Sequence, residues 1–380
     1  MIQKLTSSKK KASDRPNGFQ VARKATPQPD LPSHEMTVRV IEDWRELAKL
    51  RTEWLRLVQT AIEPNVFYEP HVLLPALEHL ADTKTAVVVV EANVRVHPDG
   101  RKVLCGLFPV RRCRSLRGLP FSTLEMWRHD YCFLTTPLIR EDIASETINA
   151  FLNWQQDQKQ MLLHLPLFSA GGDADRLLST GLNRIGAIRI VRDQHSRATV
   201  IRRTSTADVL HLGLSRKRRH EARRNRRKLA AEGELTVRYY EWGESPEPWI
   251  EDYLRLETSG WKGRVRSDIC GHDADRRFFE QMIAEAADAG RLMMICMQLD
   301  GNPIAMKINL PGREGVFCFK IAYDERYARY SPGVLLEMEN LEWLHRADQP
   351  VVWMDSCAQP GHTMIENIWP DRRELTSLVI

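Results

Sequence analysis

The sequence predicts a mixed α/β fold made of two halves that repeat one order of elements. Apolar residues at helical spacing alternate with runs of β-branched and apolar residues that are typical of buried strands. In each half, two predicted helices precede a β-hairpin, whose turn falls at residues 97–100 in the first half and 300–301 in the second. The chain has 380 residues, which is enough for two domains of ordinary size.

The predicted elements follow the chain in order. The first half has helices at 42–60 and 71–80, strands at 85–92 and 103–111, a helix at 143–159, a strand at 161–167 and a helix at 175–185. The second half has helices at 215–232, 248–259, 274–289 and 333–345, and strands at 236–240, 292–299, 303–309, 316–322 and 351–355. We therefore expect one domain over 35–192 and a second over 193–380, after a tail at 1–34.

The tail explains the net charge of the chain. Residues 1–34 carry seven basic and two acidic side chains, which accounts for the whole formal charge of +5. This segment is rich in Lys, Ser and Pro and poor in aromatic residues, so we expect it to be disordered. A solubilising role is favoured, and loose binding to anionic surfaces is the alternative.

Other features of the composition indicate a cytoplasmic protein. The seven cysteines include no Cys-x-x-Cys pair, and most lie in apolar runs, so we expect buried free thiols in a reducing compartment. No apolar run approaches the ~18–20 residues of a membrane span, and the amino terminus lacks the apolar region of a signal peptide. Cys270 and His272 are too few ligands for a zinc site, so no metal is expected.

The junction between the predicted strand at 316–322 and the helix at 333–345 is the most informative segment. It contains Ser331-Pro332-Gly333, where proline presets φ and glycine lets a ligand approach the backbone. The unpaired N–H groups and the dipole at a helix start suit a phosphate or pyrophosphate. Many helices begin this way and bind nothing.

This junction resembles the acyl-CoA-binding turn of the GNAT acyltransferase superfamily, and in particular its FemAB/CelD-like branch. Three more segments resemble that branch: the Gly-Trp-Lys-Gly at 260–263, the basic segment 214–229, and the Trp-Arg-His-Asp-Tyr at 127–131 followed by Thr-Pro-Leu at 136–138. The resemblance covers about residues 38–375. The chain departs from the usual Arg/Gln-x-x-Gly-x-Gly/Ala turn, because Pro332 and Val334 follow Arg329 at the small-residue positions.

The resemblance implies tandem GNAT-like domains with mixed central sheets flanked by helices. It also implies transfer of an acyl group, with acetyl expected, from acyl-CoA to an amine acceptor, a small molecule or a sugar-linked amine of polysaccharide or envelope metabolism. Lys320, Ile321, Ala322 and Tyr323 would lie beside the thioester, and Arg329, Ser331, Gly333 and Val334 at the pyrophosphate. The candidates for the general base are, in order, Glu257, His129 and Asp355.

Two other functions stay open at this point. One is an aminoacyl-tRNA-dependent transferase, as in the Fem proteins, with the basic segment on the RNA. The other is a catalytically inactive scaffold. The absence of a Gly-x-Ser-x-Gly elbow, a Walker loop, a Gly-x-Gly-x-x-Gly turn or a His-Glu-x-x-His motif agrees with direct transfer, which needs no covalent intermediate.

The basic segment is the next most specific signal. Residues 216–228 hold nine Arg or Lys and one Glu on a predicted helix, which therefore favours a nearby anion. A structural or substrate-phosphate role is favoured over nucleic acid, because no aromatic platform is interleaved with the charges. Arg223 and Arg227 are the proposed substrate contacts.

The remaining candidate residues each have a structural alternative. Trp261 and Lys262 would line the acceptor side of a cleft, or else form a helix C-cap with a packed indole. His129 has a side chain whose reference pKa suits acid–base chemistry, although a lone histidine is more often structural. Asp355 ends a predicted strand and would orient an amine or simply cap the strand.

Overall fold

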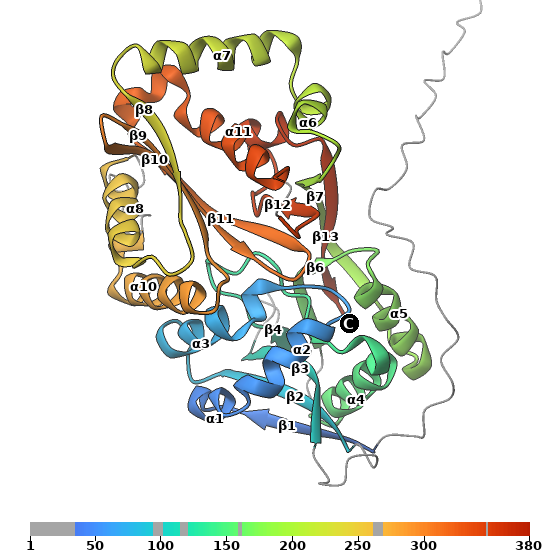
Figure 1. The fold of residues 1–380 in the computed structure, drawn as a ribbon. Helices are drawn as coiled ribbons and strands as arrows, with labels where there is room; N and C mark the ends of the chain where they lie inside the picture. Colours follow the sequence, from blue (N-terminus) through green and yellow to red (C-terminus); the bar gives the residue numbers. More distant parts are fainter. Residues whose placement is uncertain (1–34, 94–101, 115–120, 159–161, 261–268, 347–348) are drawn as a thin grey trace, which may run out of the picture.

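The computed structural model describes residues 35–93, 102–114, 121–158, 162–260, 269–346 and 349–380 (Figure 1). The predicted tail at 1–34 and the predicted turn at 97–100 lie outside these residues. The described strands form one mixed sheet of 13 strands, with the order β1-β2-β3-β4-β6-β13-β7-β12-β11-β10-β9-β8 and β5 paired to β3.

The first half contains strands β1 to β7 and five α-helices of the described chain. Its elements are β1 (Glu35–Ile41), α1 (Trp44–Ala48), α2 (Arg51–Thr60), α3 (Pro70–His79), β2 (Thr85–Asn93), β3 (Lys102–Cys113), β4 (Thr123–Met126), β5 (Leu138–Ile139), α4 (Ala144–Asp157), β6 (Leu162–Ser169), α5 (Asp173–Ile185) and β7 (Ile190–Ile201). Alternate residues of β2 and β3 face opposite ways: Phe108 stacks on Phe151 of α4, and Val87 faces α1 and α3. The half therefore has helices on both faces of its strands.

The second half repeats this layout. Its elements are α6 (Thr206–Gly213), α7 (Arg216–Ala230), β8 (Leu235–Tyr239), α8 (Glu247–Ser259), α10 (Asp273–Asp288), β9 (Met293–Leu299), β10 (Asn302–Pro311), β11 (Gly315–Tyr323), α11 (Pro332–Leu344), β12 (Trp353–Asp355), α12 (Thr363–Glu366) and β13 (Asp371–Val379). Helices α8 and α10 cover one face of β8–β11, and α11 covers the other (Figure 1). Buried polar pairs fix α11 on the sheet: Lys307 with Glu337, and Asn309 with Asn340 at 2.8 Å.

The two halves exchange their last strands. In each half a helix joins two parallel strands: α4 lies between β4 and β6, and α11 lies between β11 and β12. The next strand in space comes from the other half, because β6 pairs with β13 and β12 pairs with β7. β7 and β13 then pair with each other and join the halves into one sheet (Figure 1).

The predicted elements agree with the structure in type, and most differences are at their ends. One predicted helix, 42–60, is wrong as a single element, because Lys49 and Leu50 separate α1 from α2. Strands β1, β4, β5, β7 and β13 and helices α6 and α12 were not predicted. β7 and β13 carry charged residues along much of their length, and such residues hide a strand pattern. The predicted boundary between 192 and 193 falls within β7, so the division into domains stays a prediction.

Candidate active site

A free strand edge lies at the centre of the site. β11 and β12 are parallel but pair over only three residues, Gly315–Phe317 with Trp353–Asp355. Beyond this point, residues 318–323 of β11 pair with β10, and no strand of the described chain pairs with their other edge. The carboxyl ends of parallel strands are where α/β sheets bind ligands. The open edge of β11 therefore offers backbone N–H and C=O groups to an extended ligand.

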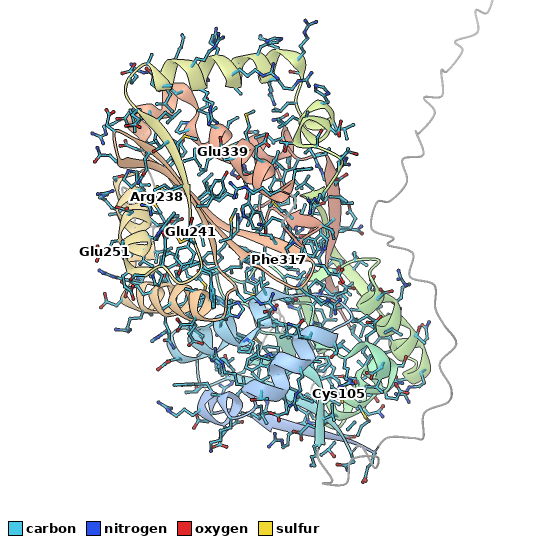
Figure 2. The ribbon with its side chains drawn as sticks, viewed as in Figure 1. Cys105, Arg238, Glu241, Glu251, Phe317 and Glu339 are labelled. Carbon is cyan, nitrogen blue, oxygen red and sulfur yellow. The ribbon has the colours of Figure 1, made fainter. Side chains whose placement is uncertain are left out.

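A bulge in β11 turns the side chains of two consecutive residues, Phe319 and Lys320, towards the first half. Lys320 pairs with Ile308 and Cys318 pairs with Asn309, which leaves Phe319 as an extra residue. As a result Phe319 packs near Phe133 and Phe279, and the Lys320 ammonium lies over the ring of Tyr131, 4.9 Å from its centroid. Figure 2 shows Phe317 of the same strand where the second half meets the first.

Glu257 lies beside this lysine. It is on the last turn of α8, where its carboxylate is buried and accepts a hydrogen bond from the Ile269 amide at 3.0 Å. Its Oε1 is 3.3 Å from Nζ of Lys320. Burial, with the charges of Asp275 and Glu257 nearby, raises the pKa of Tyr131, so this phenol stays protonated. The structure thus brings together the first-ranked base, Lys320 and a neutral hydroxyl.

His129 is on the same side of the sheet, within the aromatic cluster that contains Tyr131. Its ring centroid is 5.2 Å from those of Trp127 and Phe278 and 6.2 Å from that of Tyr131. Both ring nitrogens are buried, with no hydrogen-bond partner in the described chain. Burial, with Arg128 adding to it, lowers the pKa of His129 to about 3. The imidazole is therefore neutral at ordinary pH and a weak base.

Asp355, the third candidate base, is fully buried at the end of β12. Its Oδ2 is 3.3 Å from Nη1 of Arg373, its Oδ1 is 3.7 Å from Nη1 of Arg197, and Oδ1 also accepts the Cys357 amide at 2.9 Å. Both arginines come from the exchanged strands β7 and β13. This arrangement favours the structural alternative for Asp355.

The turn before α11 has an anion-binding geometry. Ser331 has a left-handed backbone (φ 54°, ψ 54°) after a 3₁₀ turn, Glu325–Tyr330, a sequence of conformations that turns successive N–H groups to one side. In the described chain, the Gly333 amide has no hydrogen-bond acceptor. Tyr323, at the end of β11, lies against Gly333, since its ring would be 3.7 Å from a Cβ added there. The site at β11 and the turn are therefore contiguous.

A cavity of about 260 Å³ opens at this turn. Its lining comes from the start of α11, from α12 and from α7, and includes Ser331, Val334, Met364, Arg218 and Asn225. Asn225 is only 7% exposed, and it lines this cavity. Its side-chain amide has both a donor and an acceptor that a polar ligand could use.

The other predicted contacts lie near the cavity or outside the described chain. The side chain of Arg329 is exposed and pairs with Glu232 at 3.2 Å. Arg223 and Arg227 are exposed on α7, which buries Ala222, Asn225 and Leu229. Trp261 and Lys262 lie outside the described residues.

The comparisons with known proteins agree with this geometry. Residues 216–355 match the family model described as an acetyltransferase (GNAT) domain. The chain carries a GNAT acetyltransferase domain. The matched segment of this GNAT domain runs from α7 to the end of β12, so it contains Glu257, Lys320 and the turn before α11. No curated protein sequence matches the chain.

Solved structures show a similar fold over most of the chain. The crystal structure of FemX is 9% identical, covers 85% of this chain and 95% of its own, and has a TM-score of 0.52. A conserved protein of unknown function from Bacteroides thetaiotaomicron is 12% identical, covers 88% of this chain and 97% of its own, and has a TM-score of 0.54. The GNAT domain thus belongs to a larger two-part fold that both proteins share.

Two kinds of feature are absent from the described residues. No helix among them is long and apolar enough to cross a membrane. They also contain no group of three or more His, Cys, Asp or Glu side chains placed to hold a metal ion.

Two residues of the site were not singled out by the sequence for their roles. Asn225 was missed, although a signal was present: it falls three residues after Ala222 and four before Leu229, on the buried stripe of a charged helix. Tyr131 lay inside a segment that resembles the family, but its proximity to Lys320 depends on the bulge in β11, which no local pattern announces.

Proposed function

We propose that this protein is an acyl-CoA-dependent N-acyltransferase, with acetyl as the transferred group. The observation that carries the proposal is the free edge of β11, which leads from the cavity at the start of α11 to Glu257 and Lys320. The pyrophosphate would bind the Gly333 amide and the left-handed turn at Ser331. The pantetheine arm would lie along residues 320–323 as an added strand partner.

The chemistry needs few groups. A backbone N–H of the β11 edge would polarise the thioester carbonyl, and the site would hold the amine close to it. Glu257 would accept the amine proton as the nitrogen bonds to the carbonyl carbon. The C–S bond then breaks, and the protonated phenol of Tyr131 is a nearby source of the proton for the thiolate. Lys320 would hold the Glu257 carboxylate in place.

The acceptor side is proposed from the resemblance. Trp261 and Lys262 would line it, with the indole as a flat apolar wall and the ammonium on an anionic group. A small or sugar-linked amine of polysaccharide or envelope metabolism, in the cytoplasm, fits these groups. His129 would be a wall of this side rather than a base, because its imidazole is neutral.

Calorimetric titration with acetyl-CoA tests the proposal. The wild-type protein should bind it, and Gly333→Glu should abolish binding, because a carboxylate would occupy the pyrophosphate position. A Cβ at Gly333 would be 3.3 Å from the sulfur of the flexible Met364 side chain, and φ at this residue is not positive. Both Gly333→Glu and Gly333→Ala should therefore fold. Gly333→Ala is the matched control, because it adds a side chain without a charge.

The outcomes separate the alternatives. Binding by wild type and Gly333→Ala but not by Gly333→Glu supports the site. Equal binding by all three proteins would place the donor elsewhere. No binding by the wild type would exclude an acyl-CoA enzyme and leave the transferase that uses aminoacyl-tRNA, or the inactive scaffold.

One observation favours the tRNA alternative enough to test it. Seven basic side chains of α7 have no counter-ion in the described chain: Arg216, Lys217, Arg218, Arg219, Arg223, Arg227 and Lys228. We expect only weak, salt-sensitive binding in a gel shift with tRNA or duplex DNA. Tight binding that persists at about 200 mM salt would reverse the order of the two functions.

A further inference from the structure

Three side chains on neighbouring strands, two of the first half and the exchanged strand β13 of the second, form a nucleophile–base–carboxylate chain. Oγ of Ser377, on β13, is 3.0 Å from Nε2 of His164, on β6. Nδ1 of the same histidine is 2.6 Å from Oε2 of Glu125, on β4. The tautomer that follows has Nδ1–H donating to the carboxylate and Nε2 accepting from the hydroxyl. This is the arrangement that activates a serine for attack on a carbonyl carbon, and it is recognised by geometry rather than by sequence motif.

Ser377 lies where the sheet is irregular on both sides. Against β6, Thr376 pairs with Phe168 and Leu378 pairs with Leu165, so two residues of β6 oppose Ser377 alone. Against β7, Ser377 pairs with Asp193 and Leu378 pairs with Val191, so that strand also has an extra residue. Bulges re-aim side chains, interrupt the backbone ladder and recur beside active sites.

Backbone strain occurs at the same position. Leu167, one of the two residues of β6 opposite Ser377, has φ of 47°, which is unfavourable for a side chain with a Cβ. The carbonyls of Pro166 and Leu167 are engaged by Thr135 rather than by β13. A strained, non-glycine backbone of this kind persists only where the surrounding structure holds it, and it clusters at functional sites.

The triad is partly open to solvent. The side chains of Glu125 and His164 are 26% and 11% exposed, and Ser377 is half-buried. Ile190 and Val191, which pair with the two residues after Ser377, are exposed. Arg192, the extra residue of β7, has a buried Nη1 without a hydrogen-bond partner in the described chain.

We propose that Ser377, His164 and Glu125 form a second, nucleophilic acyl site that hydrolyses esters of small or apolar carboxylic acids. Ser377 Oγ bonds to the carbonyl carbon while its proton passes to Nε2 of His164. The ester C–O bond then breaks, and the alcohol leaves with that proton. Water attacks the acyl-serine, gives its proton to His164, and releases the carboxylic acid with Ser377 restored. The site is independent of the proposed acyl-CoA site, because its residues lie on β4, β6 and β13.

A fluorophosphonate probe tests this site on the full-length protein. It should phosphonylate Ser377, identified by mass spectrometry of the carboxy-terminal peptide, and p-nitrophenyl acetate should be hydrolysed above the background rate. Ser377→Ala should abolish both signals. His164→Gln and Glu125→Gln should slow labelling by about 10²-fold or more. Ser179→Ala is the control, since this serine of α5 donates to the Asp175 carbonyl and accepts from Arg189, with no histidine among its hydrogen-bond partners in the described chain.

A second variant keeps the test valid if Ser377→Ala folds poorly. Ser377→Cys retains a nucleophile at the same atom and should exchange fluorophosphonate labelling for rapid alkylation by iodoacetamide, against a background in which five of the seven native cysteines are buried. If the wild type is not labelled, or is labelled at another serine, the proposal is wrong. Labelling of Ser377 at the same rate in His164→Gln would also overturn it, because a merely exposed serine needs no base.

Discussion

Glu257 is the residue on which the proposed chemistry depends most. Glu257→Gln keeps the size of the side chain and its hydrogen bond from Ile269, but it removes the negative charge and the proton acceptor. We expect release of CoA from acetyl-CoA with a panel of primary amines to fall by about 10²-fold or more, with acetyl-CoA affinity unchanged. Stopped assays of the free thiol, with calorimetry on the same preparation, measure both quantities.

The matched control for this variant is Glu251→Gln. Glu251 is exposed on the same helix, α8, away from β11 (Figure 2), so its substitution should leave turnover unchanged. Melting temperatures must be compared too, because Lys320 loses its partner in Glu257→Gln. Turnover per folded molecule that equals that of the wild type would remove Glu257 from the mechanism.

Glu69 gives a pH-dependent prediction that is independent of catalysis. It is buried at the start of α3, where desolvation raises its pKa to about 7 although the Arg291 charge opposes the shift. The unfolded carboxyl ionises near 4.5, so between these values only the folded state keeps the proton, and stability falls as pH rises. Glu69→Gln has no carboxyl group to ionise, so it should not lose stability in this way as pH rises. Its stability relative to wild type should therefore rise by about 3 kcal/mol between pH 4.5 and pH 7.

Urea unfolding at several pH values measures this difference. His71, whose pKa burial lowers to about 3, titrates in the opposite sense but is present in both proteins, so its contribution cancels. Glu78→Gln, an exposed change on the same helix, is the control and should show no such trend. A relative stability that does not vary with pH would show that Glu69 ionises freely in the folded protein.

At the scale of elements, α7 combines exposure with unbalanced charge. Arg223 and Arg227 are one turn apart, and each has further basic neighbours at helical spacing, an arrangement that destabilises a helix by about 0.2–0.5 kcal/mol per pair. Reversing both to Glu should raise the melting temperature slightly at low salt, and the gain should disappear at high salt. The same change should raise the acceptor KM and leave acetyl-CoA affinity intact.

Differential scanning calorimetry at two salt concentrations, with steady-state kinetics, tests this prediction. Lys84→Glu with Arg112→Glu is the matched control, because these are adjacent exposed basic residues of the first half. A stability gain without any kinetic cost would mean that the charges of α7 serve no substrate.

The elements also show how far the sequence could predict this protein. β2, β9 and β10 are apolar runs, and α8, α10 and α11 have clear boundaries, so local pattern sufficed for them. β7 and β13 could not be recognised as strands from the sequence, because polar side chains occupy much of each strand. Their exchange between the halves depends on long-range pairing, which a local pattern does not contain. For the site, the resemblance and the strand–turn–helix pattern pointed to Ser331 and Gly333. The proximity of Glu257, Lys320 and Tyr131 requires the bulge at Phe319 and the contact between halves.

At the scale of the molecule, the exchanged strands couple the two halves through one buried charge cluster. Asp355 of β12 contacts Arg197 of β7 and Arg373 of β13, and Arg373 also reaches Glu63 and Ser169 of the first half, at 3.6 and 3.2 Å. Removing one member of a buried ion pair leaves an uncompensated charge, which costs about 3–5 kcal/mol. Because residues of both halves form the cluster, removing the Asp355 charge should destabilise both halves.

Asp355→Asn should therefore lower the melting temperature strongly while the protein still unfolds in one transition. Asp371→Asn should cost less, because it breaks a more exposed pair with Arg203, at 2.7 Å; Asp371 is on β13, the strand that also carries Arg373. Calorimetry gives the number of transitions, and CoA release per folded molecule tests the catalytic alternative. A protein with normal stability and lost turnover would assign Asp355 to the reaction. Two separate transitions in either variant would show that the halves fold independently despite sharing their strands.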